Sequence, residues 1–290
     1  MEDKGVLYIA MGDRFYEEAK ISAESLKENN SGIQTCLITD QHREDDAFDE
    51  VRIEEPNEGS DKIQYMDKSP FNKTLLLDTD TLIVDDITEL FDLLEQFDIA
   101  FAHNPKRISN NIQTGEKNTF EDVPKAFPEL NGGVILFEND NKFVNFAQDI
   151  REMYSARQQK YGQVMAEQPV FRKILYKSDM RFTILPPEYN CRLSLGGVLS
   201  EKMKIAHSRL IDVGGFGRPK NLNVREAAKK INSVEGIRIF YYHKGGVKVK
   251  KRKEKVSRMI KEALDNYGAK GTAIRSLKKL KESGLKATEF

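Results

Sequence analysis

The sequence contains no tryptophan and only two cysteines among its 290 residues. Cys36 and Cys191 lie far apart in no pairing motif, which argues against a disulfide framework and indicates a reduced, cytosolic setting. No segment approaches the ~18 consecutive apolar residues of a membrane span. Residues 1–12 have an apolar run too short, and flanks too acidic, for a secretory signal. We therefore expect a cytoplasmic protein.

The net charge is zero because 46 basic residues balance 46 acidic ones, but the two signs are unevenly distributed. Residues 244–290 carry 15 Lys and Arg against 5 Asp and Glu, whereas residues 1–243 carry 31 against 41. This predicts an acidic folded domain at 1–243 and a basic tail at 244–290 that serves as an interaction element. The tail lacks aromatic residues interleaved with its basic ones, so we expect no nucleic-acid partner.

Apolar runs alternate with helical patterns along the domain. Strands are predicted at residues 6–10, 35–40, 51–55, 73–86 with a break at 78–80, 98–103, 132–138, 181–186 and 203–208, and helices near 15–26 and at 87–97, 142–158 and 169–176. This alternation predicts an α/β fold with a doubly wound sheet.

Two aspartates interrupt one of the apolar segments. Asp78 and Asp80 follow three leucines at the predicted end of a buried strand, and open α/β sheets bind ligands outside the carboxyl ends of strands. Residues spaced i, i+2 on a regular strand share one face, and carboxylates crowded there repel unless a cation intervenes. Oxygen ligands suit Mg²⁺ or Mn²⁺, which also bind diphosphate. The plainer alternative is a pair of solvated turn residues, although charges beside a core strand need a reason.

Five segments, in order, resemble GT-A glycosyltransferases of the glycogenin and lipopolysaccharide galactosyltransferase group. SPFNKTLLLDTDTLIVDDITELF (69–91) resembles the donor-site strand with its DxD motif and the DI-x-ELF helix start. The other four segments are FPELNGGVILFE (127–138), AEQPVF (166–171), FTILPPEYNCR (182–192) and KIAHSR (204–209). The resemblance implies a GT-A fold, a Rossmann-like mixed sheet flanked by helices, here with a basic helical extension.

The same resemblance implies a metal-dependent transfer of a sugar from a nucleotide-diphosphate donor, expected to be a UDP-sugar, to a hydroxyl of a glycan, glycolipid or lipid-linked acceptor. Asp78, Asp80 and His207 are the implied ligands of Mn²⁺ or Mg²⁺, and a neutral imidazole suits such an ion. The alternative for His207 is a half-buried strand residue. The group resembled is retaining, a mechanism that requires no base opposite the leaving group, and we favour retention on this resemblance.

The positions implied to contact the donor are Ala10, Met11, Gly12, Asp40, Lys62, Asp78, Thr79, Gly132 and Gly133. The first three follow the first strand, where the family holds uracil and ribose, and Asp40 is expected near the base. Lys62 matches a lysine that reaches the diphosphate, and the two glycines are expected to face the donor sugar. An ordinary cap for Asp40 and a solvated surface lysine for Lys62 are the plainer alternatives.

Asn131, Glu167 and Gln168 are the implied catalytic group. Glu167 and Gln168 replace the family's Asp-Gln pair, and the carboxylate is expected to hold a sugar hydroxyl, to act as a base or to lie beside the reacting carbon. A glutamate that merely favours a helix N-terminus is the alternative. Tyr189 and Asn190 are expected to shape the pocket.

The segment after His207 departs from the family. The family has a G-x-x-KPW element at this point, and residues 214–219 match it only in part and contain no tryptophan. Arg218 or Lys220 is therefore expected to supply the cation of that element. The polar stretch 104–126 is expected to be a lid or an acceptor contact.

Two other functions fit part of the pattern. Haloacid-dehalogenase-type phosphatases also place D-x-D after an apolar strand, which would make Asp78 a nucleophile. Their motif usually follows the first strand and continues with glycine, where this chain has Thr81. A nucleotide-sugar-binding protein without activity is the other alternative.

The basic tail carries an apolar stripe at helical spacing over residues 254–267 and a second short helical pattern around 274–280. A basic amphipathic helix lies readily on an anionic membrane surface. Packing of the stripe on the domain, or against a second copy of the chain, is the alternative. We therefore expect peripheral membrane contact or self-association through this tail.

Overall fold

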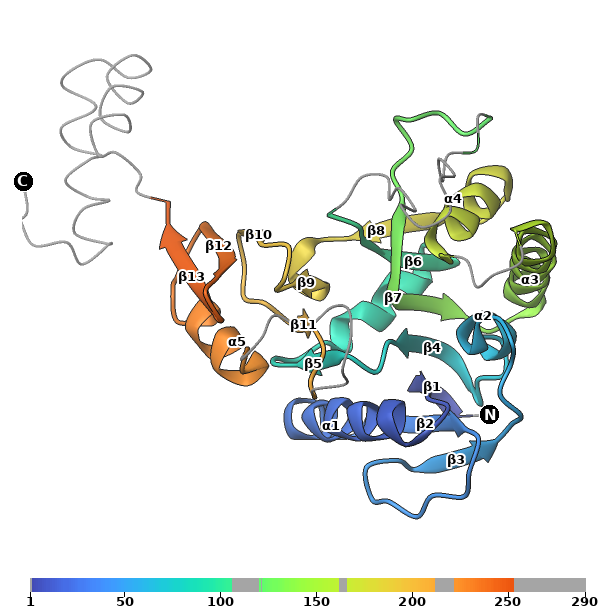
Figure 1. Cartoon of the computed structure of the whole chain (residues 1–290), viewed down its shortest axis with the longest axis horizontal. Helices are drawn as coiled ribbons and strands as arrows, with labels where there is room; N and C mark the ends of the chain where they lie inside the picture. The colour runs from blue at the N-terminus through green and yellow to red at the C-terminus, as the bar shows by residue number, and fades with distance from the viewer. Residues whose placement is uncertain (1, 106–119, 121, 162–165, 212–221, 253–290) are drawn as a thin grey trace, which may run out of the picture. The chain divides into compact units, whose positions relative to one another are not determined.

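The computed structural model describes residues 2–105, 120, 122–161, 166–211 and 222–252 (Figure 1). One compact unit runs from Met1 to Lys250, and a second comprises Lys251–Phe290. The helices predicted for the tail, and most of the predicted loop at 104–126, lie outside the described residues. None of the helices in the described ranges is long and apolar enough to cross a membrane.

A mixed, seven-stranded sheet forms the centre of the first unit, in the order β3-β2-β1-β4-β7-β6-β8. Neighbouring strands are parallel except that β7 runs antiparallel to β4 and β6. The strands are β1 (Glu2–Ile9), β2 (Gln34–Thr39), β3 (Glu50–Ile53), β4 (Phe71–Leu77), β6 (Ile99–His103), β7 (Leu130–Glu138) and β8 (Phe182–Leu185). The chain leaves β1 toward β2 on one side and resumes at β4 on the other. The ends of β1 and β4 are therefore a topological switch point, where such sheets bind ligands.

Successive side chains of the central strands face two separate cores. In β1, Val6 and Tyr8 belong to one core, and Leu7 belongs to the other. The same alternation holds in β4 and β7, so both faces of the sheet are buried and the strands have nearly continuous apolar sequences. The first core is covered by α1 (Asp13–Asn29) and the 3-10 helix η1 (Thr88–Glu95), and the second by α2 (Asp61–Tyr65), α3 (Asn141–Tyr161) and α4 (Gln168–Lys177). The expected α/β fold with a mixed sheet flanked by helices is confirmed.

Two small sheets complete the unit. One contains β5 (Thr81–Ile83), β11 (Ile205–His207) and β9 (Cys191–Arg192), and the other β10 (Gly197–Leu199), β12 (Arg238–His243) and β13 (Gly246–Lys251). Together with α5 (Val224–Asn232) they enclose a third, smaller core. A short 3-10 helix, η2 (Pro187–Tyr189), precedes β9. Residues 189–192 and 205–207 are thereby brought beside the segment that follows β4.

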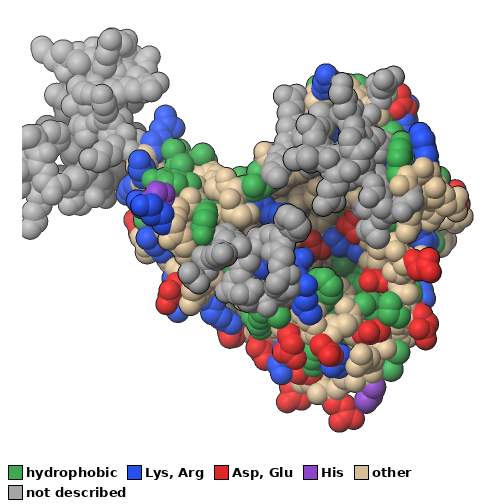
Figure 2. Space-filling view, in the orientation of Figure 1, with side chains coloured by type: hydrophobic (Ala, Val, Ile, Leu, Met, Phe, Trp, Pro, Cys, Tyr) green, Lys and Arg blue, Asp and Glu red, His purple; other side chains and the backbone are tan. Residues whose placement is uncertain are grey.

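The hairpin of β12 and β13 crosses the domain boundary predicted at residue 243. It turns at Lys244 and Gly245, whose φ angles of 46° and 83° are of the sign that tight hairpin turns favour. The basic residues at the start of the predicted tail therefore form a strand of the first compact unit. Figure 2 shows Lys and Arg side chains gathered over this hairpin.

Candidate active site

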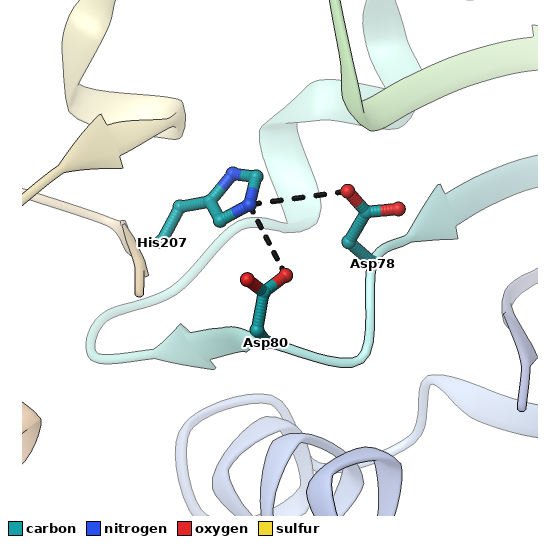
Figure 3. A group of neighbouring side chains, drawn as sticks. All are labelled: Asp78, Asp80 and His207. Atoms are coloured by element: carbon teal, nitrogen blue, oxygen red, sulfur yellow. Dashed lines mark ion pairs between the residues drawn. The ribbon is translucent and has the colours of Figure 1, made fainter. Parts of the chain in front are cut away.

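Three side chains with metal-ligand chemistry meet beyond the end of β4 (Figure 3). Asp78 follows β4, Asp80 precedes β5, and His207 ends β11, which pairs with β5. His207 Nε2 lies 3.1 Å from Asp80 Oδ1 and 3.9 Å from Asp78 Oδ2. Only 3% of the His207 side chain is exposed, whereas the two aspartates retain 25% and 16% exposure. The group is therefore open on its carboxylate side.

A turn, and not a regular strand, brings the two carboxylates together. β4 ends at Leu77 and β5 begins at Thr81, whose N–H donates to the carbonyl of Asp78 at 3.2 Å. The Asp78 N–H donates to the Gly133 carbonyl at 2.9 Å, and the Ser208 N–H donates to the Asp80 carbonyl at 2.9 Å. The expectation that i, i+2 spacing on one strand face would align the aspartates is thus wrong, although their convergence is as predicted.

A chain of hydrogen bonds selects the tautomer of His207. The Gly133 N–H donates to Asn131 Oδ1 at 2.9 Å, so this atom is an acceptor, and Asn190 Nδ2 donates to it at 3.1 Å. The remaining amide atom of Asn190 is therefore the oxygen, which lies 2.6 Å from His207 Nδ1. Nδ1 must carry a proton to donate to it. In the neutral ring the Nε2 lone pair then points at the two carboxylates, as metal-ligating histidines require.

The chain passes His207 closely only because residue 133 is glycine. A Cβ atom at Gly133 would lie 2.3 Å from His207 Cε1 and 2.8 Å from Asn131 Oδ1. A Cβ at Gly132 would lie 2.8 Å from the Phe171 ring. The two glycines were expected to face a donor sugar. In the structure Gly133 lies against the imidazole, and the Gly132 carbonyl accepts from Lys62 Nζ at 3.2 Å.

Lys62 lies between two carboxylates at the edge of this group. Its Nζ is 2.5 Å from Asp78 Oδ1 and 3.1 Å from Glu167 Oε2, and the side chain is 18% exposed. Burial lowers the pKa of Lys62, but Asp78 and Glu167 outweigh burial and raise it above its ordinary value. Lys62 is therefore a fixed cation beside the aspartates, and the reading of it as a solvated surface lysine is wrong.

The carboxyl of Asp80 is held in its ionised form. Burial alone would raise the pKa of Asp80, but the neighbouring His207 and Arg209 lower it well below its ordinary range. Two carboxylate oxygens and His207 Nε2 face one point, an arrangement that is favourable when the ring is protonated or when a cation takes the place of that proton. Carboxylate and imidazole ligands suit a divalent cation such as Mn²⁺ or Mg²⁺. The residues present therefore fit the implied metal ion.

The predicted nucleotide-binding residues lie at the ends of β1 and β2. Ala10 is buried, Met11 and Gly12 are partly exposed, and the Gly12 N–H donates to Asp40 Oδ1 at 2.9 Å. This backbone hydrogen bond lowers the pKa of Asp40 below its ordinary value. The positive φ of Gly12, 80°, turns the chain from β1 into α1. Contact of these residues with a base stays a prediction.

The three predicted catalytic residues occupy different surroundings. Asn131 is 2% exposed and belongs to the hydrogen-bond chain that orients His207. Glu167 accepts from the Ser60 hydroxyl and pairs with Lys62, while Gln168 begins α4 and is partly exposed. Their catalytic roles stay predictions.

Other predicted residues add to the site or lie outside the described ranges. Asn190 orients His207, whereas the Tyr189 hydroxyl donates to Glu89. Arg218 and Lys220 lie outside the described residues. Sequence reasoning missed buried Glu18 and its partner Arg209, although a glutamate on the buried face of a helix was a visible signal.

Substitution of Lys62 with methionine is expected to weaken the binding of UDP in the presence of Mn²⁺ by about tenfold or more, since an ion pair or hydrogen bond to a charged group is lost. Calorimetric titration of the full chain with UDP measures this loss. Lys68→Met is the matched control, because Lys68 also pairs with a glutamate, Glu54, but is 44% exposed. Equal UDP affinities in the two variants would contradict a role for Lys62 at the diphosphate.

The sheet topology and the Asp-Asp-His group at its switch point are together those of a GT-A glycosyltransferase. The sequence profile of glycosyl transferase family 8 matches residues 63–211, and the chain belongs to this family. The matched range contains both aspartates, Glu167 and His207. A search of curated proteins found no match.

Several solved structures are similar to this chain. Galactosyltransferase LgtC, in complex with donor and acceptor sugar analogs, is 16% identical, with 64% of this chain and 74% of LgtC covered and a TM-score of 0.45. The glycosyltransferase GlyE of Streptococcus pneumoniae TIGR4 is 14% identical, with 79% of this chain and 60% of GlyE covered and a TM-score of 0.51. Mouse xyloside xylosyltransferase 1 is 14% identical, with 71% and 97% covered and a TM-score of 0.47. At this identity the likeness to GlyE shows a shared fold alone.

Proposed function

We propose that this glycosyltransferase moves a sugar from a UDP-sugar to a hydroxyl acceptor and that the transfer depends on Mn²⁺ or Mg²⁺. The observation that supports metal dependence most directly is the convergence of Asp78, Asp80 and the His207 Nε2 lone pair within 4.8 Å of one another. A bound divalent cation would neutralise the diphosphate as it leaves the sugar. The family assignment favours this function over the phosphatase and over a binding protein without activity.

The chain's own residues contribute fixed charges and positions. Asn131 and Asn190 keep the His207 ring in one tautomer and one orientation. Lys62 supplies a cation that needs no rearrangement during the reaction, and preorganised charges of this kind stabilise charge that develops on a leaving group. The diphosphate is therefore proposed to leave toward Lys62 and toward the divalent cation that Asp78 and Asp80 would hold.

Retention of the anomeric configuration is proposed because the predicted carboxylate base is already engaged. Glu167 Oε1 accepts from the Ser60 hydroxyl, and Oε2 pairs with Lys62 Nζ at 3.1 Å. Inversion requires a carboxylate that is free to take a proton from the acceptor. The pairing of both oxygens makes Glu167 better suited to orienting donor and lysine than to removing a proton.

The acceptor is proposed to be a glycan, a glycolipid or another hydroxyl compound. A cytoplasmic location, and contact of the tail with a membrane or with a second copy, stay predictions. The tail's apolar stripe lies outside the described residues.

Thermal unfolding of the full chain tests the donor class and the metal together. A ligand that binds only the folded state at about 100 times its Kd adds about 2.7 kcal/mol of stability, a rise of roughly 5–10 °C in Tm for a domain of this size. We expect this rise with UDP or a UDP-sugar plus Mn²⁺, and little change with UDP plus EDTA or with ADP. A rise that is the same in EDTA would contradict metal dependence. Hydrolysis of p-nitrophenyl phosphate that Asp78→Ala abolishes would instead support the phosphatase.

A further inference from the structure

Polar side chains of helix α1 form a row along β5, the strand that follows the turn with Asp78 and Asp80. β5 has β11 as a strand neighbour on one side, in a sheet of the order β5-β11-β9. On its other side, side chains of α1 take the place of a strand. Ser22 Oγ lies 3.0 Å from Thr81 Oγ1, and Ser25 Oγ accepts from the Ile83 N–H at 2.9 Å. Glu18 begins this row one helical turn before Ser22.

Glu18 is fully buried and joins the two segments that carry the metal ligands. Its side chain has 0% exposure. Oε1 accepts from the Leu210 N–H at 2.9 Å, and Oε2 accepts from Arg209 Nη1 at 2.7 Å and from the Thr79 hydroxyl at 3.4 Å. A buried carboxylate is costly without such partners. Glu18 thus contacts the residue between the two aspartates and the two residues that follow Ser208.

Arg209 is shared unequally between two carboxylates. Its Nη1 donates to Glu18 at 2.7 Å, whereas its Nε remains 3.7 Å from Asp80 Oδ2, beyond hydrogen-bond distance. Each aspartate has one oxygen toward His207 and the other toward a cation, which is Lys62 for Asp78 and Arg209 for Asp80. A guanidinium paired fully with Asp80 would occupy the oxygen that a metal ion needs.

We propose that Glu18 is a positioning residue that holds Arg209 off Asp80 and so keeps the carboxylate of Asp80 available to a divalent cation. This inference rests on the proposed metal site. Among the described residues, the other carboxylate within salt-bridge distance of Arg209 is that of Asp80, at 3.7 Å. Without the negative charge of Glu18, the arginine would pair with it bidentately, the geometry that guanidinium and carboxylate favour. Arg209 would become a competitor of the metal ion.

A double substitution distinguishes this role from a merely structural one, because it shows whether removal of Arg209 restores the Mn²⁺ affinity that Glu18→Gln loses. Mn²⁺ alone is titrated calorimetrically into the full chain, and thermal unfolding reports whether each variant is folded. We expect Glu18→Gln to weaken Mn²⁺ binding by about tenfold or more, because the ion must then displace a hydrogen-bonded ion pair between Arg209 and Asp80. Arg209→Met is expected to bind Mn²⁺ at least as tightly as the unmodified protein, and the double variant to regain most of the affinity lost in Glu18→Gln. Glu17→Gln, the same change on the exposed neighbour, is the control that should leave binding unchanged.

Each alternative result is decisive. A double variant as weak as Glu18→Gln, or a Glu18→Gln variant that binds normally, would overturn the proposal. If Glu18→Gln does not fold, Arg209→Met still decides, because weaker Mn²⁺ binding in that variant would show that Arg209 supports the site and does not compete with the ion. Failure of the unmodified protein to bind Mn²⁺ would overturn the metal site itself, and this outcome is distinct from all the others.

Discussion

Replacement of Asp80 with asparagine is expected to lower the rate of Mn²⁺-dependent sugar transfer by about 10³-fold, since a metal ion supplies several kcal/mol of charge stabilisation and each 1.36 kcal/mol corresponds to tenfold in rate. Asp80 Oδ1 is the carboxylate oxygen nearest to His207 Nε2. Asparagine keeps the size of the side chain and removes its charge. Release of UDP from a UDP-sugar, measured across a Mn²⁺ titration, checks the result.

The matched control for this substitution is Asp92→Asn, because Asp92 is exposed in the nearby 3-10 helix. It should retain full activity, which would exclude an effect of net charge alone. If Asp80→Asn retained Mn²⁺-dependent activity near that of the control, the metal site would have to be placed elsewhere.

Gly133→Ala is expected to have the second-largest effect. The added Cβ would lie 2.3 Å from His207 Cε1, so the ring or strand β7 must move. Displacement of an active-site group by about 1 Å can lower the rate about 10²-fold. Overpacking of a filled interior also lowers the free energy of unfolding, typically by about 1–3 kcal/mol. Activity, Mn²⁺ affinity and thermal unfolding are measured on the same preparation, which separates a displaced ligand from an unfolded chain.

Gly246→Ala is the control for this change. No atom lies within 4 Å of a Cβ built at Gly246, and its backbone φ is not in the left-handed region. It should leave stability and activity close to those of the unmodified protein. If Gly133→Ala behaved in the same way, the close approach of His207 to β7 would have no role in positioning the ligand.

The central sheet was predictable because its inner strands have strong local signals. The leucines of β4 and the apolar run of β7 are buried on both faces of the sheet, and such strands have nearly continuous apolar sequences. The short strands β9, β10, β12 and β13 were not predicted, because two to six residues with mixed polarity give little periodicity. The predicted helix at 87–97 is a 3-10 helix at Thr88–Glu95, and Asp86 Oδ1 accepts from the Thr88 N–H at 2.8 Å just before it.

The candidate site was predictable where a motif carried it. Asp78, Asp80, His207 and Lys62 were all named from the sequence, and the structure brings them together. That the two glycines face a donor sugar stays a prediction, whereas the contact of Gly133 with His207 could not be predicted, because it is decided by the position of β11 relative to β7. The pairing of Glu18 with Arg209 escaped notice because the two residues are 191 positions apart, and Glu18 belongs to no motif.

The sequence by itself determined the long strands and helices of the central sheet, the position of two aspartates at the end of a buried strand, and the family. These depend on local composition and spacing, which the chain carries without reference to its fold. Tertiary structure alone decided which oxygen of each aspartate faces His207, which tautomer that ring adopts, and which cation Glu18 holds. Such choices depend on strand order and helix packing, because these bring together side chains that are distant along the chain.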